Sequence, residues 1–220
     1  MTTVLLVRHG RTTANACGIL AGWTPGVGLD DHGRRQATEL GARLASVPLN
    51  AVVSSPLQRC VETVGLLLGD RPDPVDVQED EGVGECRYGD WTGEELKVLA
   101  KDPLWKVVQA HPSAARFPGD DAESLADMSA RAVATVRRWN ERLGDDATYV
   151  VCSHADVIKA ILADAMGLHL DQFQRIVVDP ASVSVVNYAP LRPFVVRTND
   201  TAGDLSSFAP KPKRRGRRRA

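Results

Sequence analysis

The chain of 220 residues contains no apolar run that approaches the roughly 20 residues needed to span a bilayer. Its N-terminus, MTTVLLVRHG, also lacks a basic segment followed by a long apolar stretch, so no secretion signal is predicted. These two absences predict a cytoplasmic protein that does not contact a membrane.

Cysteine is scarce, and its spacing is uninformative. Cys17, Cys60, Cys86 and Cys152 form no C-x-x-C pair and no zinc-like spacing with the five histidines. They are predicted to be small buried residues of a reducing compartment, with no metal site. Three of them adjoin polar residues considered below, which leaves sensitivity to oxidation open.

Net charge is nearly absent at −1, but its distribution is uneven. The last ten residues, KPKRRGRRRA, hold seven Lys or Arg and no acid, so the remainder has 20 basic against 28 acidic residues and a net charge of −8. We predict one domain over residues 1–197, followed by a linker and a disordered basic tail over 198–220. Weak, salt-dependent contact of the tail with a polyanion is an alternative. Because the last ten residues contain no aromatic side chain, sequence-specific recognition of nucleic acid is not expected.

Short apolar segments alternate with amphipathic ones along most of the chain. Strands are predicted at Thr3–Val7, Ala51–Ser54, Val75–Gln78, Thr148–Cys152, Ser182–Tyr188 and Phe194–Arg197. Helices are predicted at His32–Val47, Leu57–Leu68, Glu123–Leu143 and Ala155–Met166. The expected fold class is α/β, a three-layer α/β/α sandwich with a mostly parallel central sheet.

Polar residues follow three of the predicted strands directly. Arg8-His9-Gly10 follows the first, Ser54 to Arg59 the second, and Ser153-His154 the fourth. Parallel strands open their carboxyl ends on one edge of a sheet, where ligands bind. We therefore expect two histidines and two arginines to converge there, although a single histidine on an apolar element is more often a core residue.

The stretch over residues 79–122 has weak periodicity and is long for a connection, which is typical of a lid or binding loop. It contains Glu85, Tyr88, Trp91 and Gly93.

Four short motifs carry a family resemblance. Arg8-His9-Gly10-x-Thr12-x-x-Asn15 is one, and Ser54 to Arg59 followed by Glu62-Thr63 is the second. Glu85 with Tyr88-Gly89-x-Trp91-x-Gly93 is the third, and Ser153-His154 is the fourth. Together they resemble the histidine phosphatase superfamily, also called the phosphoglycerate mutase-like family, over about residues 3 to 190. The resemblance implies a phosphoglycerate mutase-like fold.

The resemblance also implies that His9 is a nucleophile that accepts a phosphoryl group as phosphohistidine. A nucleophilic imidazole must be neutral, and the flanking Arg8 and Arg59 should lower its pKa. The same guanidinium groups can donate to phosphoryl oxygens. Ser55 and Pro56 are predicted to begin a helix, which would put Arg59 in its first turn, a favourable place only if an anion binds there.

The remaining roles follow from the same resemblance. Glu85 is the expected general acid, with a raised pKa, and His154 is a second ligand of the transferring phosphoryl group. Asn15 and Arg11 are expected to support the phosphate. The alternatives are a solvated carboxylate for Glu85, a capping or core histidine for His154, and a surface ion pair with Glu62 for Arg59.

The segment Cys17 to Trp23 is apolar where the family often has an arginine, and Ala155-Asp156 follows His154 where glycines are usual. Such a wall, with Trp23 expected to contact the substrate, favours an organic phosphate larger than a triose. The insertion between Glu85 and His154 is short for a mutase, which favours hydrolysis, since a mutase must exclude water.

The predicted function is a metal-independent phosphomonoester hydrolase that acts on a small-molecule phosphate ester and needs no cofactor. A cofactor-dependent phosphoglycerate-type phosphomutase is the alternative, and a non-catalytic protein that binds a phosphorylated ligand is the second. A homodimer is also considered.

Overall fold

The computed structural model describes residues 1–69, 71 and 73–202, and its centre is a six-stranded sheet. In spatial order the strands are β3 (Val77–Glu79), β2 (Ala51–Ser54), β4 (Thr148–Ser153), β1 (Thr2–Arg8), β5 (Val183–Tyr188) and β6 (Pro193–Asp200). β3, β2, β4 and β1 run parallel to one another, and β5 is antiparallel to both β1 and β6. The prediction of a mostly parallel sheet is confirmed.

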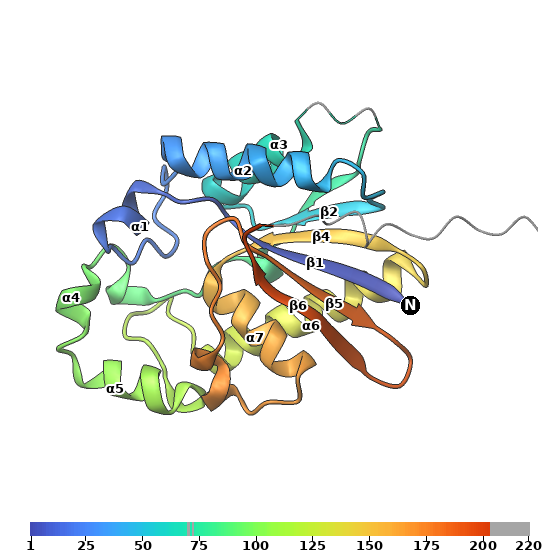
Figure 1. The fold of residues 1–220 in the computed structure, drawn as a ribbon. Helices are drawn as coiled ribbons and strands as arrows, with labels where there is room; N and C mark the ends of the chain where they lie inside the picture. The colour runs from blue at the N-terminus through green and yellow to red at the C-terminus, as the bar shows by residue number, and fades with distance from the viewer. Residues whose placement is uncertain (70, 72, 203–220) are drawn as a thin grey trace, which may run out of the picture.

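Helices cover both faces of the sheet (Figure 1). α2 (Asp31–Leu44) and α3 (Gln58–Leu68) lie on one face, and α6 (Leu125–Leu143) and α7 (Ala155–Ala165) lie on the other. The alternation along β1 explains this arrangement, because Leu5 and Val7 join the core under α2 and α3 while Val4 and Leu6 join the core under α6 and α7. The three-layer sandwich is therefore confirmed.

The helices begin and end at residues whose side chains stabilise the ends. Asp30 accepts a hydrogen bond from the backbone N–H of Gly33 and caps α2. Ser124 caps α6 in a reciprocal capping box with Asp127, and Gly144 ends that helix. Glu123, predicted as helical, lies before the cap.

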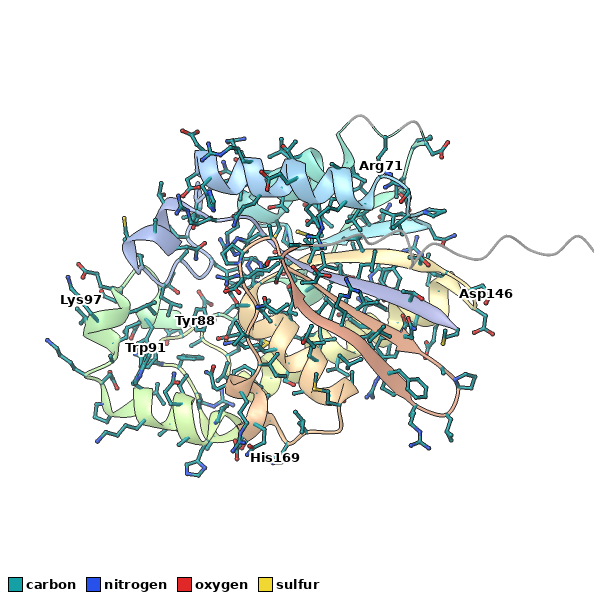
Figure 2. All side chains as sticks on the ribbon, in the orientation of Figure 1. Arg71, Tyr88, Trp91, Lys97, Asp146 and His169 are labelled. Carbon is teal, nitrogen blue, oxygen red and sulfur yellow. The ribbon has the colours of Figure 1, made fainter. Side chains whose placement is uncertain are left out.

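The stretch over residues 79–122 forms a cover beyond the carboxyl edge of the sheet. It holds α4 (Leu96–Leu99), α5 (Pro103–Ala110) and short 3₁₀ turns, and it lies beside α1 (Thr13–Cys17) (Figure 1). Figure 2 shows Tyr88 and Trp91 on the side of the sheet that this cover occupies. The predicted binding loop is thus a partly helical cover with its own packed aromatic residues.

The predicted boundary of the domain at residue 197 is wrong by a few residues. β6 continues to Asp200, whose largely buried carboxylate accepts hydrogen bonds from Arg43, at 2.7 Å, and from Arg197. Residues 198–200 are therefore part of the sheet rather than a linker. The rest of the predicted linker and the basic tail, residues 203–220, lie outside the described part of the chain.

Within the described residues, no helix combines the length and the apolar character that crossing a membrane requires.

We predict that Asp200→Ala destabilises the domain by about 1–3 kcal/mol, because two arginines and the N–H of Ala202 lose their shared acceptor. Urea denaturation checks this. Asp145→Ala, which removes an exposed partner of the N-terminal amine, is the matched control and should cost under about 0.5 kcal/mol. If the two variants are equally stable, residues 198–200 do not contribute to the stability of the domain.

Candidate active site

The three polar junctions meet at one edge of the sheet. β1 ends at Arg8, which is in register with Ser153 at the end of β4, and Ser54 at the end of β2 is in register with Cys152. The residues that follow each strand therefore emerge at the same level, as the sequence predicted. They line or border a cavity of about 280 Å³.

His9 is almost fully buried and held in one orientation. Its Nδ1 lies 2.7 Å from the carbonyl oxygen of Gly10, which can only accept, so Nδ1 carries the proton and Nε2 keeps its lone pair. Burial, reinforced by the charges of Arg59 and Arg8, holds the pKa of His9 well below its usual value. The imidazole is thus neutral at physiological pH, as a nucleophile must be.

Gly10 allows this loop to approach α2 closely. A Cβ at this position would lie 2.5 Å from the carbonyl oxygen of Gly33, so no larger residue fits without a backbone shift. The backbone N–H of Gly10 donates to the hydroxyl of Thr63, which ties the loop after His9 to α3.

The guanidinium groups of the buried Arg59 and the half-buried Arg8 flank His9. Arg59 is 2% exposed, and its Nη2 donates to the carbonyl oxygen of Gly22 at 2.8 Å. Arg8 donates through Nη1 to the carbonyl oxygen of Val178 at 2.6 Å. The alternative of a surface pair between Arg59 and Glu62 is wrong, because Glu62 pairs with other groups.

The start of α3 differs from the prediction. The helix begins at Gln58 after Leu57, so Ser55 is not its N-cap, although Arg59 still lies in the first turn. The hydroxyl of Ser55 instead accepts the N–H of Leu57 at 3.3 Å and lies 2.8 Å from Nε2 of His154.

His154 is fully buried and does not cap α7 with its side chain, although it occupies the N-cap position. Nε2 of His154 lies 2.8 Å from the hydroxyl of Ser55, and Nδ1 has no hydrogen-bond partner. In the tautomer whose Nε2 accepts from Ser55, the proton is on Nδ1. Burial and the charge of Arg59 keep the pKa of His154 well below its usual value. The ring lies 5.2 Å from that of His9, so a neutral donor is placed beside the proposed nucleophile.

Glu85 is a largely buried acid rather than a solvated carboxylate, with its side chain 13% exposed. Its Oε1 accepts the N–H of Cys86 at 3.0 Å, and its Oε2 lies 3.7 Å from Nδ1 of His154. Burial raises the pKa of Glu85 to about 7, with a further contribution from the charge of Asp156 and opposition from Arg59. A carboxyl group with this pKa can both give and take a proton near neutral pH.

Three buried donors around this point have no partner. Among the described residues, the buried polar atoms without a hydrogen bond include Nε of Arg8, Nη1 of Arg59 and Nδ1 of His154. Unpaired buried donors are costly, and their concentration beside one imidazole indicates a site for an anion. An oxyanion with several acceptor oxygens, such as phosphate, satisfies them together.

Of the other predicted site residues, one lines the cavity and two do not. Asn15 lines the cavity, and its Oδ1 closes the capping box of α1 with Thr12. Arg11 does not line it, because its half-exposed guanidinium pairs with Asp30 at 2.8 Å. Trp23 lies outside the cavity as well, with its indole N–H donating to the carbonyl oxygen of Glu85 at 2.7 Å.

The walls of the cavity beyond the anion site combine large apolar side chains with the polar side chains of Gln109, Lys159 and Gln174. The large apolar side chains among the lining residues are Ile19, Leu20, Trp91, Leu96, Trp105, Val108 and Phe117. The predicted apolar wall from the loop after His9 is therefore present, made by Ile19 and Leu20 rather than by Trp23.

Sequence reasoning missed a polar group at the start of α7. Asp156 accepts a hydrogen bond from the hydroxyl of Tyr88 at 2.9 Å and one from Lys159 at 3.2 Å, and Lys159 also donates to Gln174. The sequence offered one signal of this group, because Asp156 stands where the family usually has glycine. Its partners come from the cover and from α7, and spacing along the chain does not reveal them.

The thiols are free, and three of them are buried. Burial raises the pKa of Cys86, and a hydrogen bond with Cys60 together with burial raises that of Cys152. Neutral thiols react slowly with oxidants, so these two are packing residues. In the described part of the chain, no cluster of three or more His, Cys, Asp or Glu side chains is placed to hold a metal ion.

Comparison with known proteins agrees with this geometry. A family model described as histidine phosphatase superfamily (branch 1) matches residues 4–201. The 2,3-bisphosphoglycerate-dependent phosphoglycerate mutase 2 of Gloeobacter violaceus is 30% identical over 81% of this chain and 82% of its own length. The glucosyl-3-phosphoglycerate phosphatase of Mycolicibacterium vanbaalenii is 31% identical over 77% of this chain and 76% of its own. The solved structure of Bacillus stearothermophilus YhfR superposes with a TM-score of 0.82 at 27% identity, covering 91% of this chain and 98% of that one.

We predict that orthophosphate raises the melting temperature of this protein, because it satisfies the unpartnered donors of the folded state only. At 100 times its Kd it adds roughly 2.7 kcal/mol to the stability. Arg59→Met should abolish the shift, and Arg34→Met, which removes a half-exposed arginine of α2, should retain it. A shift of the same size in all three proteins would mean that the anion binds elsewhere.

Proposed function

The chain belongs to the histidine phosphatase superfamily, and from this premise we propose that it hydrolyses small organic phosphate esters through a phosphohistidine at His9. It is a phosphomonoesterase of that superfamily. One observation supports the site assignment above all. A neutral, oriented imidazole lies among three buried donors that lack a partner.

In the first step Nε2 of His9 attacks phosphorus, and the bond from phosphorus to the ester oxygen breaks. Arg8, Arg59 and His154 donate to the three equatorial oxygens and stabilise the charge that spreads over them. The carboxyl of Glu85 gives its proton to the departing oxygen, so the alcohol leaves neutral and Glu85 becomes a carboxylate.

In the second step the carboxylate of Glu85 takes a proton from a water molecule. The hydroxide that forms attacks phosphorus, the P–N bond to His9 breaks, and its electron pair returns to Nε2. Phosphate leaves, His9 is again neutral and Glu85 is again protonated, so the cycle closes without any other reactant.

Positive charge at the phosphoryl group comes from Arg8 and Arg59, which is the role that a metal ion has in other phosphatases. We propose that the reaction therefore needs neither a metal nor an organic cofactor. We also propose a cytoplasmic location, which the free thiols support. The contact of the basic tail with a polyanion and the homodimer stay predictions.

The substrate we propose is an organic phosphate larger than a triose phosphate. The apolar and aromatic walls beyond Glu85 support this, since they would contact the alcohol part of the ester. The name of the phosphatase from Mycolicibacterium vanbaalenii, with its glucosyl-3-phosphoglycerate, also supports it.

The similarity to a phosphoglycerate mutase favours a second candidate, transfer of the phosphoryl group back to a bound phosphoglycerate. The convergence of His9, Glu85, Arg59 and His154 speaks against the non-catalytic alternative, because the site has every group the chemistry uses.

We predict that His9→Ala lowers kcat against a panel of phosphate monoesters by at least about 10³-fold, since the nucleophile is lost. EDTA should leave the wild-type rate unchanged. Acid-free quenching followed by mass spectrometry should find phosphate on His9 in the wild type. Inhibition by EDTA, or an active His9→Ala variant, would contradict the proposed reaction.

The two candidate functions separate on 3-phosphoglycerate with a trace of 2,3-bisphosphoglycerate. Hydrolysis releases inorganic phosphate, whereas a mutase produces 2-phosphoglycerate without releasing it. Isomer without free phosphate would replace the hydrolase by the mutase.

The pH dependence follows from two groups. The active form has neutral His9, whose pKa is lowered, and protonated Glu85, whose pKa is raised to about 7. We predict that kcat/KM falls about tenfold per pH unit above pH 7 and that the acid limb lies below the ordinary histidine pKa. Glu85→Gln should remove the limb near pH 7 and lower kcat/KM by about 10²–10⁴-fold.

Glu94→Gln, at an exposed position of the same cover, is the control and should keep the wild-type profile. If the limb near pH 7 persists in Glu85→Gln, another group is the acid.

A further inference from the structure

We propose that Arg131, acting with Trp23, is a positioning residue for the general acid, because both hold the backbone carbonyl of Glu85 from behind the cavity. This inference rests on the proposed function. Neither side chain lines the cavity, so neither is a catalytic residue.

Two donors from distant parts of the chain converge on one oxygen. The indole N–H of Trp23 donates to the carbonyl oxygen of Glu85 at 2.7 Å, and Nη2 of Arg131 donates to the same oxygen at 2.8 Å. A carbonyl with two strong donors has little freedom to rotate. Its Cα, and with it the direction of the Glu85 side chain, is fixed.

Arg131 also shapes the segment that leads into Glu85. Its Nη1 donates to the carbonyl oxygens of Gly84, at 2.9 Å, and Gly82, at 3.1 Å. This segment is a 3₁₀ turn followed by extended backbone, without the repeated hydrogen bonds of a helix or a sheet. The planar guanidinium supplies donors that a regular element would have supplied.

The guanidinium is itself held in place. Glu123, which lies just before α6, accepts from Nε of Arg131 at 3.0 Å and from Nη2 at 2.5 Å, a bidentate pair with little exposure. The carboxylate of Glu123 also accepts the backbone N–H of Arg87 at 2.9 Å. The guanidinium of Arg87 lies 4.0 Å above the ring of Trp23.

These contacts form a closed circuit behind the acid. It runs from Trp23 to the carbonyl of Glu85, on to Arg131 and Glu123, and through Arg87 back to Trp23. Gly84 makes room for it, since a Cβ there would lie 2.6 Å from the indole ring. A circuit that closes on itself resists motion of any one member more than a single contact does.

These contacts matter for the carboxyl group of Glu85, which has to meet two requirements as a general acid. Glu85 must stay dry enough to keep its proton near pH 7 and must point at the ester oxygen. The charged and titratable groups around its carboxyl come from β1, α3, the start of α7 and its own segment: Arg8, Arg59, His154, Asp156, Cys86 and Tyr88. Arg131 is on none of these elements, and its charge is only the weakest of the causes that lower the pKa of His154. Its removal therefore leaves the nearby groups present while releasing the backbone.

The test is Arg131→Met measured on two esters, phenyl phosphate and p-nitrophenyl phosphate. Phenolate is a poor leaving group that needs a proton, and p-nitrophenolate leaves without one. We expect kcat/KM to fall about tenfold or more for phenyl phosphate and less than about threefold for p-nitrophenyl phosphate. We also expect the limb near pH 7 to move about one pH unit lower, because water reaches the carboxyl.

Two variants complete the design. Arg137 is an exposed arginine of the same helix and pairs with Asp164, so Arg137→Met is the control. It should change neither the ratio of kcat/KM for the two esters nor the limb of the pH profile near pH 7. Trp23→Phe keeps an aromatic ring but removes the indole N–H, so it should produce a smaller change in the same direction. It decides the question if Arg131→Met does not fold.

An equal loss for both esters with an unmoved pH limb would show a merely structural role and overturn the inference, as would no loss at all. Glu85→Gln separates this failure from that of the proposed function. If Glu85→Gln itself treats the two esters alike, the assignment of the acid fails. If it separates them and the Arg131 and Trp23 variants do not, only the positioning role fails.

Discussion

The active site depends on two guanidinium groups beside a neutral histidine, the buried Arg59 and the half-buried Arg8. Arg8 and Arg59 each use part of their donors on backbone carbonyls and leave one donor without a partner. Burying a cation is costly, and folding alone does not repay it here. Burial is the main cause of the lowered pKa of His9, and the charges of Arg59 and Arg8 add to it. The groups that would bind an anion therefore also help to keep the imidazole neutral.

Burial has the opposite effect on protonation at Glu85, where it keeps a proton on the carboxyl group. Arg59 and Arg8 favour the carboxylate, but burial and the charge of Asp156 outweigh them and raise its pKa to about 7. One cavity therefore holds a deprotonated imidazole and a protonated carboxyl over the same range of pH. The cover that makes Glu85 dry is also the part of the fold with the least regular structure, which is why side chains such as Arg131 have to fix its shape.

Residues whose role depends on local order were predictable. The strands and the junctions at Arg8-His9 and Ser153-His154 follow from periodicity and from the rule that parallel strands open on one edge. The roles of Arg11 and Trp23 were not predictable. Asp30 competes for the guanidinium of Arg11, and the indole of Trp23 turns behind Glu85.

By itself, the sequence determined the α/β class, the edge of the sheet at which His9, Arg59, Glu85 and His154 gather, and the family, because each rests on short patterns read along the chain. Only the tertiary structure decided which donors stay unpaired, how far burial moves each pKa, and that residues 198–200 complete β6. Those properties depend on neighbours such as Arg43 and Arg131, which are far away in sequence, and on the exclusion of water by all the layers together.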